Sequence, residues 1–172
     1  MKQNIVIVDK NDNVIGSKPR DIVIKERLRY RVTGLWIKNS NGESLPARRA
    51  YTKIQHPGRW GPAVAGTVDE GESYEENITK EAEEELDLQD IKLEKSSKTQ
   101  TSGEYNHFTQ WFISVIDKPT KDFKIQEEEV VEVKWFSKEE FSKQFENNPK
   151  EFIPKMKEYF DMFVGGQKRK RI

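Results

Sequence analysis

The chain has no cysteine and only two histidines among its 172 residues. The lack of cysteine excludes disulfide bonds, thiolate metal sites and cysteine nucleophiles together. Long apolar runs are also absent. The run at residues 5–8 is too short for the core of a signal peptide, and no stretch approaches the length of a membrane span. We therefore expect a cytoplasmic protein with no membrane partner.

The charges balance over the whole chain but not locally. Lys and Arg together number 30, as do Asp and Glu, so the formal net charge is zero and we expect no nucleic-acid partner. Residues 69–87 nevertheless hold ten acidic side chains and one basic side chain, Lys80, whereas residues 168–171 are all basic. We interpret the tail at residues 167–172 as a solubilising end, with contact to RNA as the alternative.

Hydrophobic patterning predicts strands and helices intermixed along one chain. The length fits one domain around one core, which we assign to residues 1–166. Apolar runs bounded by turn residues predict strands at residues 5–8, 14–16, 30–38, 44–49, 64–68, 91–93, 107–116 and 130–136. Helical spacing predicts helices at residues 74–87, 138–145 and 149–164. These elements favour an α/β (α+β) fold, a mixed β-sheet sandwiched by helices.

Two capping boxes mark helix starts. Ser73 is followed three residues later by Glu76, and Ser137 is followed in the same way by Glu140. In this pattern each side chain bonds the backbone N–H of the other residue, so Ser73 and Ser137 are the predicted N-caps.

The helix after Ser73 carries an unusual number of glutamates. Glu81, Glu84 and Glu85 follow the i, i+3, i+4 spacing and share a face. Glu85 falls inside the apolar stripe of this helix and Glu81 on its border, where an unpaired carboxylate would be costly to bury. Lys80 lies too far round the helix to neutralise all three. A hard divalent cation, Mg²⁺ or Mn²⁺, would do so, and the alternative is a solvated acidic face.

The same segment matches a known motif. Gly66, five residues, Glu72, seven residues and then K-E-A-E-E-E-L-D-L at residues 80–88 resemble the Nudix box, with its spacing intact over 23 positions. Lys80 stands where the family has an arginine, so bracing of the glutamates should be weaker. Asp87 stands where the family has a glycine, and Ala82 occupies the usual aliphatic position.

Segments outside the box extend the resemblance over nearly the whole chain. Residues 45–49, Lys53 and the loop at residues 57–61 resemble the strand and loop before a Nudix box, and residues 130–140 resemble the family's strand and helix after it. The opening at residues 9–20 is most similar to the subgroup of this MutT-like superfamily that is related to isopentenyl-diphosphate isomerases. Those isomerases use a catalytic cysteine, so isomerase activity is disfavoured for this chain.

The resemblance implies roles for the box residues. Glu81, Glu84 and Glu85 would bind Mg²⁺, with the carbonyl oxygen of Gly66 as a further ligand. Glu72 would be structural and would orient Lys80 and the box.

The remaining roles lie outside the box or are shared with it. The general base is expected among Glu127, Glu128 and Glu129, of which we choose Glu129, and Glu84 or Glu85 could serve instead. Glu127, Glu128 and Glu129 could each equally be a solvent-exposed residue at the end of a strand. For the substrate phosphates we favour Arg49 and Lys53 over the other cations of this region.

The resemblance implies a hydrolase that cleaves, with Mg²⁺ or Mn²⁺, a diphosphate linkage in a nucleoside diphosphate derivative or a similar small molecule. The alternative is a degenerate Nudix domain that binds a nucleotide or a protein without catalysis. The sequence leaves open whether the chain forms a homodimer. It does not give the substrate either, because specificity lies in loops outside the box.

Overall fold

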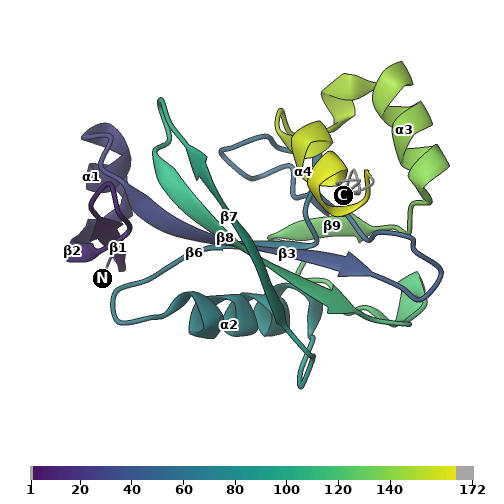
Figure 1. The fold of residues 1–172 in the computed structure, drawn as a ribbon, viewed down its shortest axis with the longest axis horizontal. Helices are drawn as coiled ribbons and strands as arrows, with labels where there is room; N and C mark the ends of the chain where they lie inside the picture. The colour runs from purple at the N-terminus through teal and green to yellow at the C-terminus, as the bar shows by residue number, and fades with distance from the viewer. Residues whose placement is uncertain (1, 166–172) are drawn as a thin grey trace, which may run out of the picture. The chain divides into compact units, whose positions relative to one another are not determined.

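The computed structural model describes residues 2–165, which fold as two compact units. The first unit comprises residues 2–35 and 64–114, and the second comprises residues 36–63 and 115–165. Figure 1 shows the elements of both. The basic tail lies outside the described residues. Every helix in the described part is too short or too polar to cross a lipid bilayer.

The first unit is built on a six-stranded sheet with the order β2-β1-β3-β8-β7, in which β6 also pairs with β3. Its strands are β1 (Asn4–Val8), β2 (Val14–Pro19), β3 (Tyr30–Lys38), β6 (Val64–Thr67), β7 (Glu94–Thr101) and β8 (His107–Val115). The last residues of β3 and β8 belong to the second unit. The strands predicted at residues 5–8, 14–16 and 30–38 are confirmed, and the first two pair as an antiparallel hairpin.

Helix α1 (Arg20–Lys25) was not predicted and follows β2 directly. Its one buried residue, Val23, packs with Ile5 and Tyr30 in a small apolar cluster. The apolar residues of this segment, Ile22, Val23 and Ile24, are consecutive and lack helical spacing, so the sequence did not indicate a helix.

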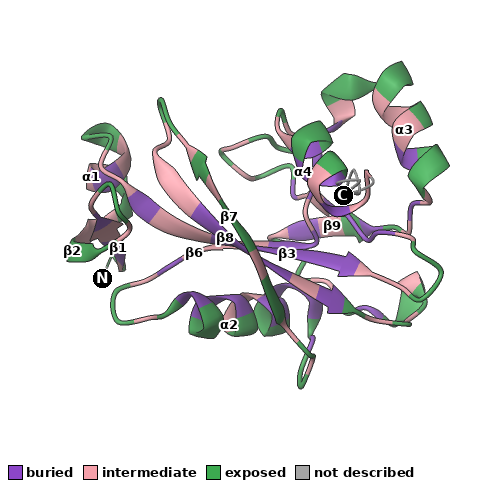
Figure 2. Ribbon diagram, in the orientation of Figure 1, coloured by how far each residue is buried: buried purple, intermediate pink, exposed green. Residues whose placement is uncertain are grey.

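Helix α2 (Tyr74–Leu86) begins where the capping box predicts, with Ser73 as N-cap and Glu76 closing the box. It packs beside β6 and buries one side (Figures 1 and 2). Glu85 is buried, with 8% of its surface exposed, whereas Glu76 and Glu83 are exposed, so the predicted helix faces are confirmed. Asp87 ends the helix in the left-handed region, with φ 52°.

The second unit contains a three-stranded sheet in which β4 (Ala47–Arg49) lies between β5 (Trp60–Gly61) and β9 (Val130–Val133). Helix α3 (Lys138–Asn147) begins at the predicted cap Ser137. The 3₁₀ turn η1 (Thr120–Asp122) precedes β9. The core of the unit is aromatic: the rings of Phe141 and Phe160 stack with centroids 3.8 Å apart.

The single helix predicted at residues 149–164 is wrong. The chain forms a 3₁₀ turn, η2 (Pro149–Glu151), then an extended stretch, and only then α4 (Met156–Phe163). Pro154 explains the break, because proline disfavours helical backbone at the residue before it. The N–H of Ile153 bonds instead to the carbonyl oxygen of Trp60, 2.9 Å away.

Three strand predictions also need correction. Residues 91–93 form no strand, and the strand here is the largely polar β7, which begins at Glu94. Residues 44–49 do not simply return along β3: only Ser44 bridges to Lys38, and β4 pairs with β5 and β9. The strand predicted at residues 130–136 ends at Val133, after which Phe136 bridges to Ser44.

A charged cluster within the first unit is centred on Asp12. Its carboxylate accepts hydrogen bonds from Arg31 Nε at 2.8 Å, Lys98 Nζ at 2.5 Å and the Tyr74 hydroxyl at 2.9 Å. Burial raises the pKa of Asp12, but these three donors outweigh it and the net pKa is lowered. The cluster therefore ties the β1–β2 turn to β3, to β7 and to the first residue of α2.

We predict that Asp12→Asn destabilises the protein at neutral pH by about 1–3 kcal/mol, because Arg31 and Lys98 lose a buried counter-charge. Asn also tolerates the left-handed backbone at this position, φ 65°, so the substitution isolates the charge. A carboxyl group with a lowered pKa stabilises the fold above its unfolded-state pKa and loses that effect on acidification. The difference from the parent should therefore narrow below about pH 4.

Urea unfolding at several pH values measures this difference. Asp90→Asn is the matched control, because Asp90 is exposed and has a similar φ of 53°. Equal losses in the two variants would contradict a special role for the Asp12 cluster.

Candidate functional site

Gly66 and Glu81 are in close contact within the first unit. Gly66 lies on β6, where it pairs with Thr33 of β3, and Glu81 projects from α2. A Cβ atom at position 66 would lie 2.6 Å from Cδ of Glu81 and 2.8 Å from its Oε1. Only glycine leaves room for this carboxylate beside the strand.

The carboxylate of Glu81 lies in an unfavourable electrostatic environment. Burial raises its pKa to about 7; Lys80 opposes the rise, while Glu84, Asp69 and Glu72 add to it. No lysine or arginine of the described residues forms an ion pair with Glu81. A half-buried carboxylate without such a partner is stabilised either by a proton or by a bound cation.

Lys80 is engaged by two acidic residues of the loop before α2. Its ammonium group donates to Oε1 of Glu72 at 2.5 Å and to Oδ2 of Asp69 at 2.9 Å. Glu72 also accepts the backbone N–H of Asp69 at 3.0 Å. Burial raises the pKa of Glu72, but these hydrogen bonds outweigh it and leave the pKa lowered. Glu72 and Lys80 thus hold the loop to the helix.

Arg49, Lys53 and Glu129, the residues predicted outside the box, all belong to the second unit. The ammonium group of Lys53 forms an ion pair with the carboxylate of Glu129. Nε of Arg49 donates to the carbonyl oxygen of Gln55 at 2.9 Å. A predicted phosphate ligand and the predicted general base are therefore paired with each other here, and their catalytic roles stay predictions.

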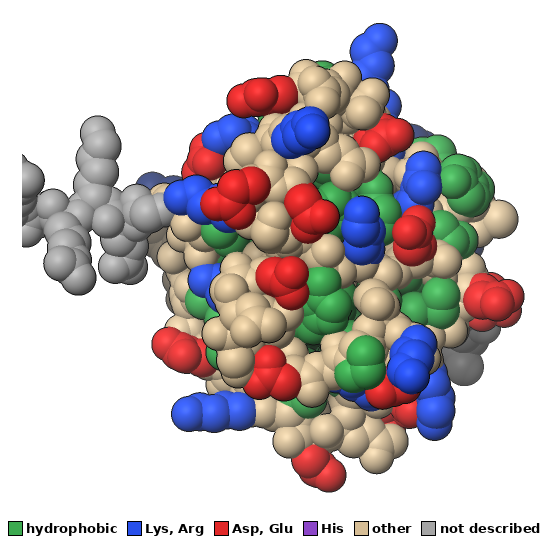
Figure 3. Space-filling view, turned by 90° about the vertical axis from the view of Figure 1, so that its right-hand side faces the viewer, with side chains coloured by type: hydrophobic (Ala, Val, Ile, Leu, Met, Phe, Trp, Pro, Cys, Tyr) green, Lys and Arg blue, Asp and Glu red, His purple; other side chains and the backbone are tan. Residues whose placement is uncertain are grey.

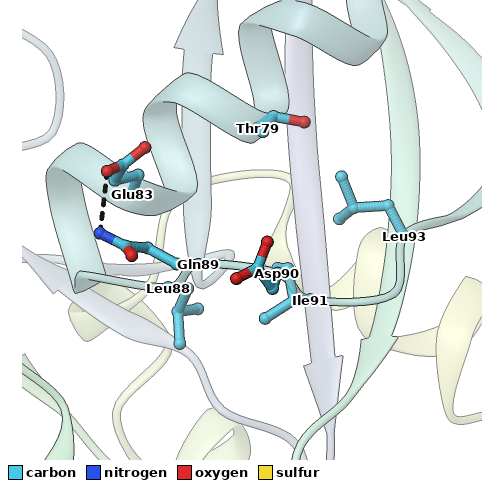
Figure 4. Close-up of a pocket in the computed structure, with 7 residues that line it drawn as sticks. All are labelled: Thr79, Glu83, Leu88, Gln89, Asp90, Ile91 and Leu93. Atoms are coloured by element: carbon cyan, nitrogen blue, oxygen red, sulfur yellow. Dashed lines mark hydrogen bonds between the residues drawn. The ribbon is translucent and has the colours of Figure 1, made fainter.

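Two observations bear on how a cation or ligand would be held. Among the described residues, no group of three or more Asp, Glu or His side chains converges closely enough to hold a metal ion. A pocket of about 400 Å³ lies beyond the end of α2, where Gln89 donates to Glu83 (Figure 4). It is lined by Thr79, Glu83, Leu88, Gln89, Asp90, Ile91 and Leu93. None of the predicted metal ligands lines it.

Sequence reasoning missed three residues that contact the box. Asp69 pairs with Lys80, and Asn77 bonds Thr33 and Glu72. Asn77 could have been noticed, because it lies four residues before Glu81 and therefore on the same side of the helix. Thr33 gave no signal, since threonine is an ordinary residue in a strand.

The comparisons with known proteins address the family directly. The family model described as "NUDIX domain" matches residues 28–156. The chain belongs to the Nudix family. An uncharacterized Nudix hydrolase of Yersinia pestis is 32% identical over 136 residues, which cover 79% of this chain and 74% of the relative.

Solved structures show the same fold. A crystal structure from Deinococcus radiodurans matches with a TM-score of 0.79 and 21% identity, over 94% of this chain and 99% of the other. An Ap4A hydrolase from C. elegans matches with a TM-score of 0.56 and 20% identity, over 80% and 99%. The predicted mixed sheet with helices is confirmed.

Membership settles the general activity of this Nudix protein. It is a hydrolase that acts on pyrophosphate bonds, and enzymes of the family generally use divalent metal ions. On the face shown in Figure 3, basic and acidic side chains are interspersed, without a large area of one sign.

We predict that Gly66→Ala destabilises the Nudix hydrolase by about 1–3 kcal/mol, since the added methyl group must displace Glu81 from the strand. Hydrolysis should fall with it. Thermal unfolding and turnover measure both effects. Gly61→Ala is the control, because its nearest neighbour would be 3.6 Å away, an ordinary contact. Full activity in Gly66→Ala would show that the observed Glu81 position is dispensable.

A second prediction concerns pH in metal-free protein. The folded-state pKa of Glu81, about 7, exceeds its ordinary value of 4.5, so the folded state binds more protons in between. Stability should therefore fall as pH rises through this window. Glu81→Gln removes the cost of a partly buried negative charge. Above pH 7 its free energy of unfolding should therefore exceed that of the parent by about 1–2 kcal/mol, allowing for solvent screening.

Urea unfolding in a chelator measures this gap, which should close below the ordinary pKa of a glutamate. Glu83→Gln is the matched control, because it removes a carboxylate from the exposed side of the same helix. A constant gap at all pH values would contradict the argument.

Proposed function

We propose that this Nudix hydrolase cleaves the diphosphate linkage of a nucleoside diphosphate derivative with Mg²⁺, with Mn²⁺ as an alternative ion. The observation that carries the proposal is the placement of two acidic side chains of α2 away from water. Glu85 is buried, and Glu81 is half-buried against Gly66 with its pKa raised. Carboxylates in such a place fit a hard divalent cation, which would relieve their mutual repulsion.

The donor set suits this cation in chemistry. Glu81, Glu84 and Glu85 would hold it, with the carbonyl oxygen of Gly66 as a further ligand. When bound, the ion supplies positive charge to the phosphate oxygens and lowers the pKa of a coordinated water. The carboxylates do not converge on one point in the described residues, so the proposal requires the exposed side chain of Glu84 to reorient toward Glu81 and Glu85 when the ion binds.

The chain's own residues have distinct parts in the proposed reaction. Glu72 and Lys80 keep the loop before α2 in place through their ion pair. Glu129 is proposed to take the proton of the attacking water, with Glu84 or Glu85 as alternatives. Lys53 is proposed to bind a phosphate oxygen. Both proposals require the Lys53–Glu129 ion pair to open when substrate binds.

The substrate class is proposed from the fold neighbours and the box. One neighbour is named as an Ap4A hydrolase, and another is a Nudix domain whose structure contains ADP ribose. Ap4A and ADP ribose both contain an adenosine attached to a chain of phosphates. Arg49 and Lys53 supply the positive charge that such a chain of phosphates needs. The single domain over residues 1–166 and the cytoplasmic location stay predictions.

We predict that Glu85→Gln weakens Mg²⁺ binding at least about 10-fold and lowers hydrolysis of ADP-ribose in proportion, because the cation loses a buried anionic ligand. Calorimetry gives the affinity and a phosphate-release assay gives the turnover. Glu83→Gln is the matched control on the exposed side of α2.

The substrate screen should include nucleoside diphosphate sugars, dinucleoside polyphosphates and prenyl diphosphates. Hydrolysis of prenyl diphosphates alone would overturn the proposed class. An unchanged Mg²⁺ affinity in Glu85→Gln would remove Glu85 from the metal site. Full activity in a chelator would overturn the requirement for a cation.

A further inference from the structure

Asn77 is a fully buried polar residue in α2, with 0% of its surface exposed. It occupies one of the seven positions that the Nudix box leaves open. Its amide nitrogen lies 3.0 Å from the carbonyl oxygen of Thr67, 2.9 Å from Oε2 of Glu72 and 3.5 Å from Oε1 of Glu81. Its amide oxygen lies 2.5 Å from the hydroxyl of Thr33.

The chemistry of these partners fixes the orientation of the amide. A backbone carbonyl such as that of Thr67 can only accept a hydrogen bond, so the NH₂ group of Asn77 must face it. The amide oxygen then faces Thr33, whose hydroxyl group donates. The NH₂ group has two hydrogens for three acceptors, so the longer contact to Glu81 is the weakest of the three.

These contacts join three elements, β3, β6 and α2, around Glu81. Thr33 on β3 pairs directly with Gly66 on β6, and Gly66 in turn contacts Glu81. Asn77 lies one helical turn before Glu81, and its amide bridges from Thr33 to the carboxylate. The Glu81 carboxylate therefore lies close to both Gly66 and the amide of Asn77.

Lys80 and Asn77 donate hydrogen bonds to different oxygens of Glu72. Lys80 donates to Oε1, whereas Asn77 donates to Oε2. Lys80 makes no hydrogen bond to Glu81 in the described residues; its other partner is Asp69. An ammonium group is a compact charge without the planar fork of a guanidinium group, and here the amide of Asn77 makes the second contact.

We propose that Asn77, anchored by Thr33, is a positioning residue that orients the carboxylate of Glu81, and that of the supporting residue Glu72, for binding of the divalent cation at Glu81. The inference rests on the proposed function, because it assigns Asn77 a role at the metal ligand Glu81. Partners that orient a metal ligand typically affect metal affinity about 10–100-fold. A buried amide that served packing alone would affect stability and leave metal affinity unchanged.

The first test is calorimetric titration with Mn²⁺. Asn77→Ala should weaken binding about 10-fold. Thr33→Val removes the anchoring hydroxyl with little change of shape and should weaken Mn²⁺ binding by a smaller factor. Thr33→Ser keeps the hydroxyl and should bind Mn²⁺ as tightly as the parent. Thr109→Val is the matched control, since Thr109 is also a buried strand threonine of this unit, bonded to His107.

Thr109→Val should lower the thermal midpoint without changing the affinity. If Asn77→Ala and Thr33→Val are folded and bind Mn²⁺ as tightly as the parent, the positioning role is overturned. If the parent itself binds no Mn²⁺, the proposed function fails.

A second measurement decides the positioning role without metal. The side-chain NH₂ signals of Asn77 in a ¹H–¹⁵N spectrum are identified by their loss in Asn77→Ala. They should shift in Glu81→Gln and in Glu72→Gln but not in Glu83→Gln. Signals that respond to neither of the first two variants would overturn the inference, whatever the metal titration shows.

Discussion

The first unit is arranged around carboxylates that lie where helix α2 meets the sheet. The helix needs its apolar stripe buried in order to be stable, and Glu85 lies within that stripe. Glu81 lies at the edge of the stripe and is only half-buried. The neighbouring residues follow from this constraint. Position 66 carries no side chain, and position 77 carries an amide that can donate to carboxylates. A side chain at position 66 would collide with Glu81, and a hydrophobic residue at position 77 could not donate a hydrogen bond to Glu72.

Two carboxylates of the first unit, both partly shielded from solvent, differ in how their negative charge is balanced. Asp12 is nearly buried, yet its pKa is lowered, because Arg31, Lys98 and Tyr74 all donate to it. Glu81 is half-buried, and burial raises its pKa, because no ion pair with a lysine or arginine of the described residues offsets the loss of solvent. The charge of Asp12 is balanced within the fold, so its role is complete without a ligand. The charge of Glu81 is not, and this imbalance is what a bound cation would correct.

The sequence was sufficient where a pattern is local and periodic. Helical spacing placed Glu85 inside, and the capping box placed the start of α2 at Ser73. Prediction from the sequence failed where a segment or side chain is placed by residues that are distant along the chain. Strand β7 is largely polar and is specified by its pairing with β8, which no property of residues 94–101 indicates. The hydrogen bond between Thr33 and Asn77 and the ion pair between Lys53 and Glu129 likewise join residues far apart in the chain.

The two departures from the usual box concern the frame and leave the carboxylates intact. Asp87 takes the left-handed conformation that glycine takes without strain, and aspartate is among the residues that tolerate it. Lys80 still reaches two acidic partners, though its single ammonium nitrogen cannot make the bidentate contact to one carboxylate that a guanidinium group makes. With lysine at position 80, a second residue is needed to orient the Glu72 carboxylate. The buried amide of Asn77 contacts the second oxygen of that carboxylate. The box in this chain is therefore best understood as a network of hydrogen bonds from β3, β6 and α2, of which the motif residues are only the part visible in the sequence.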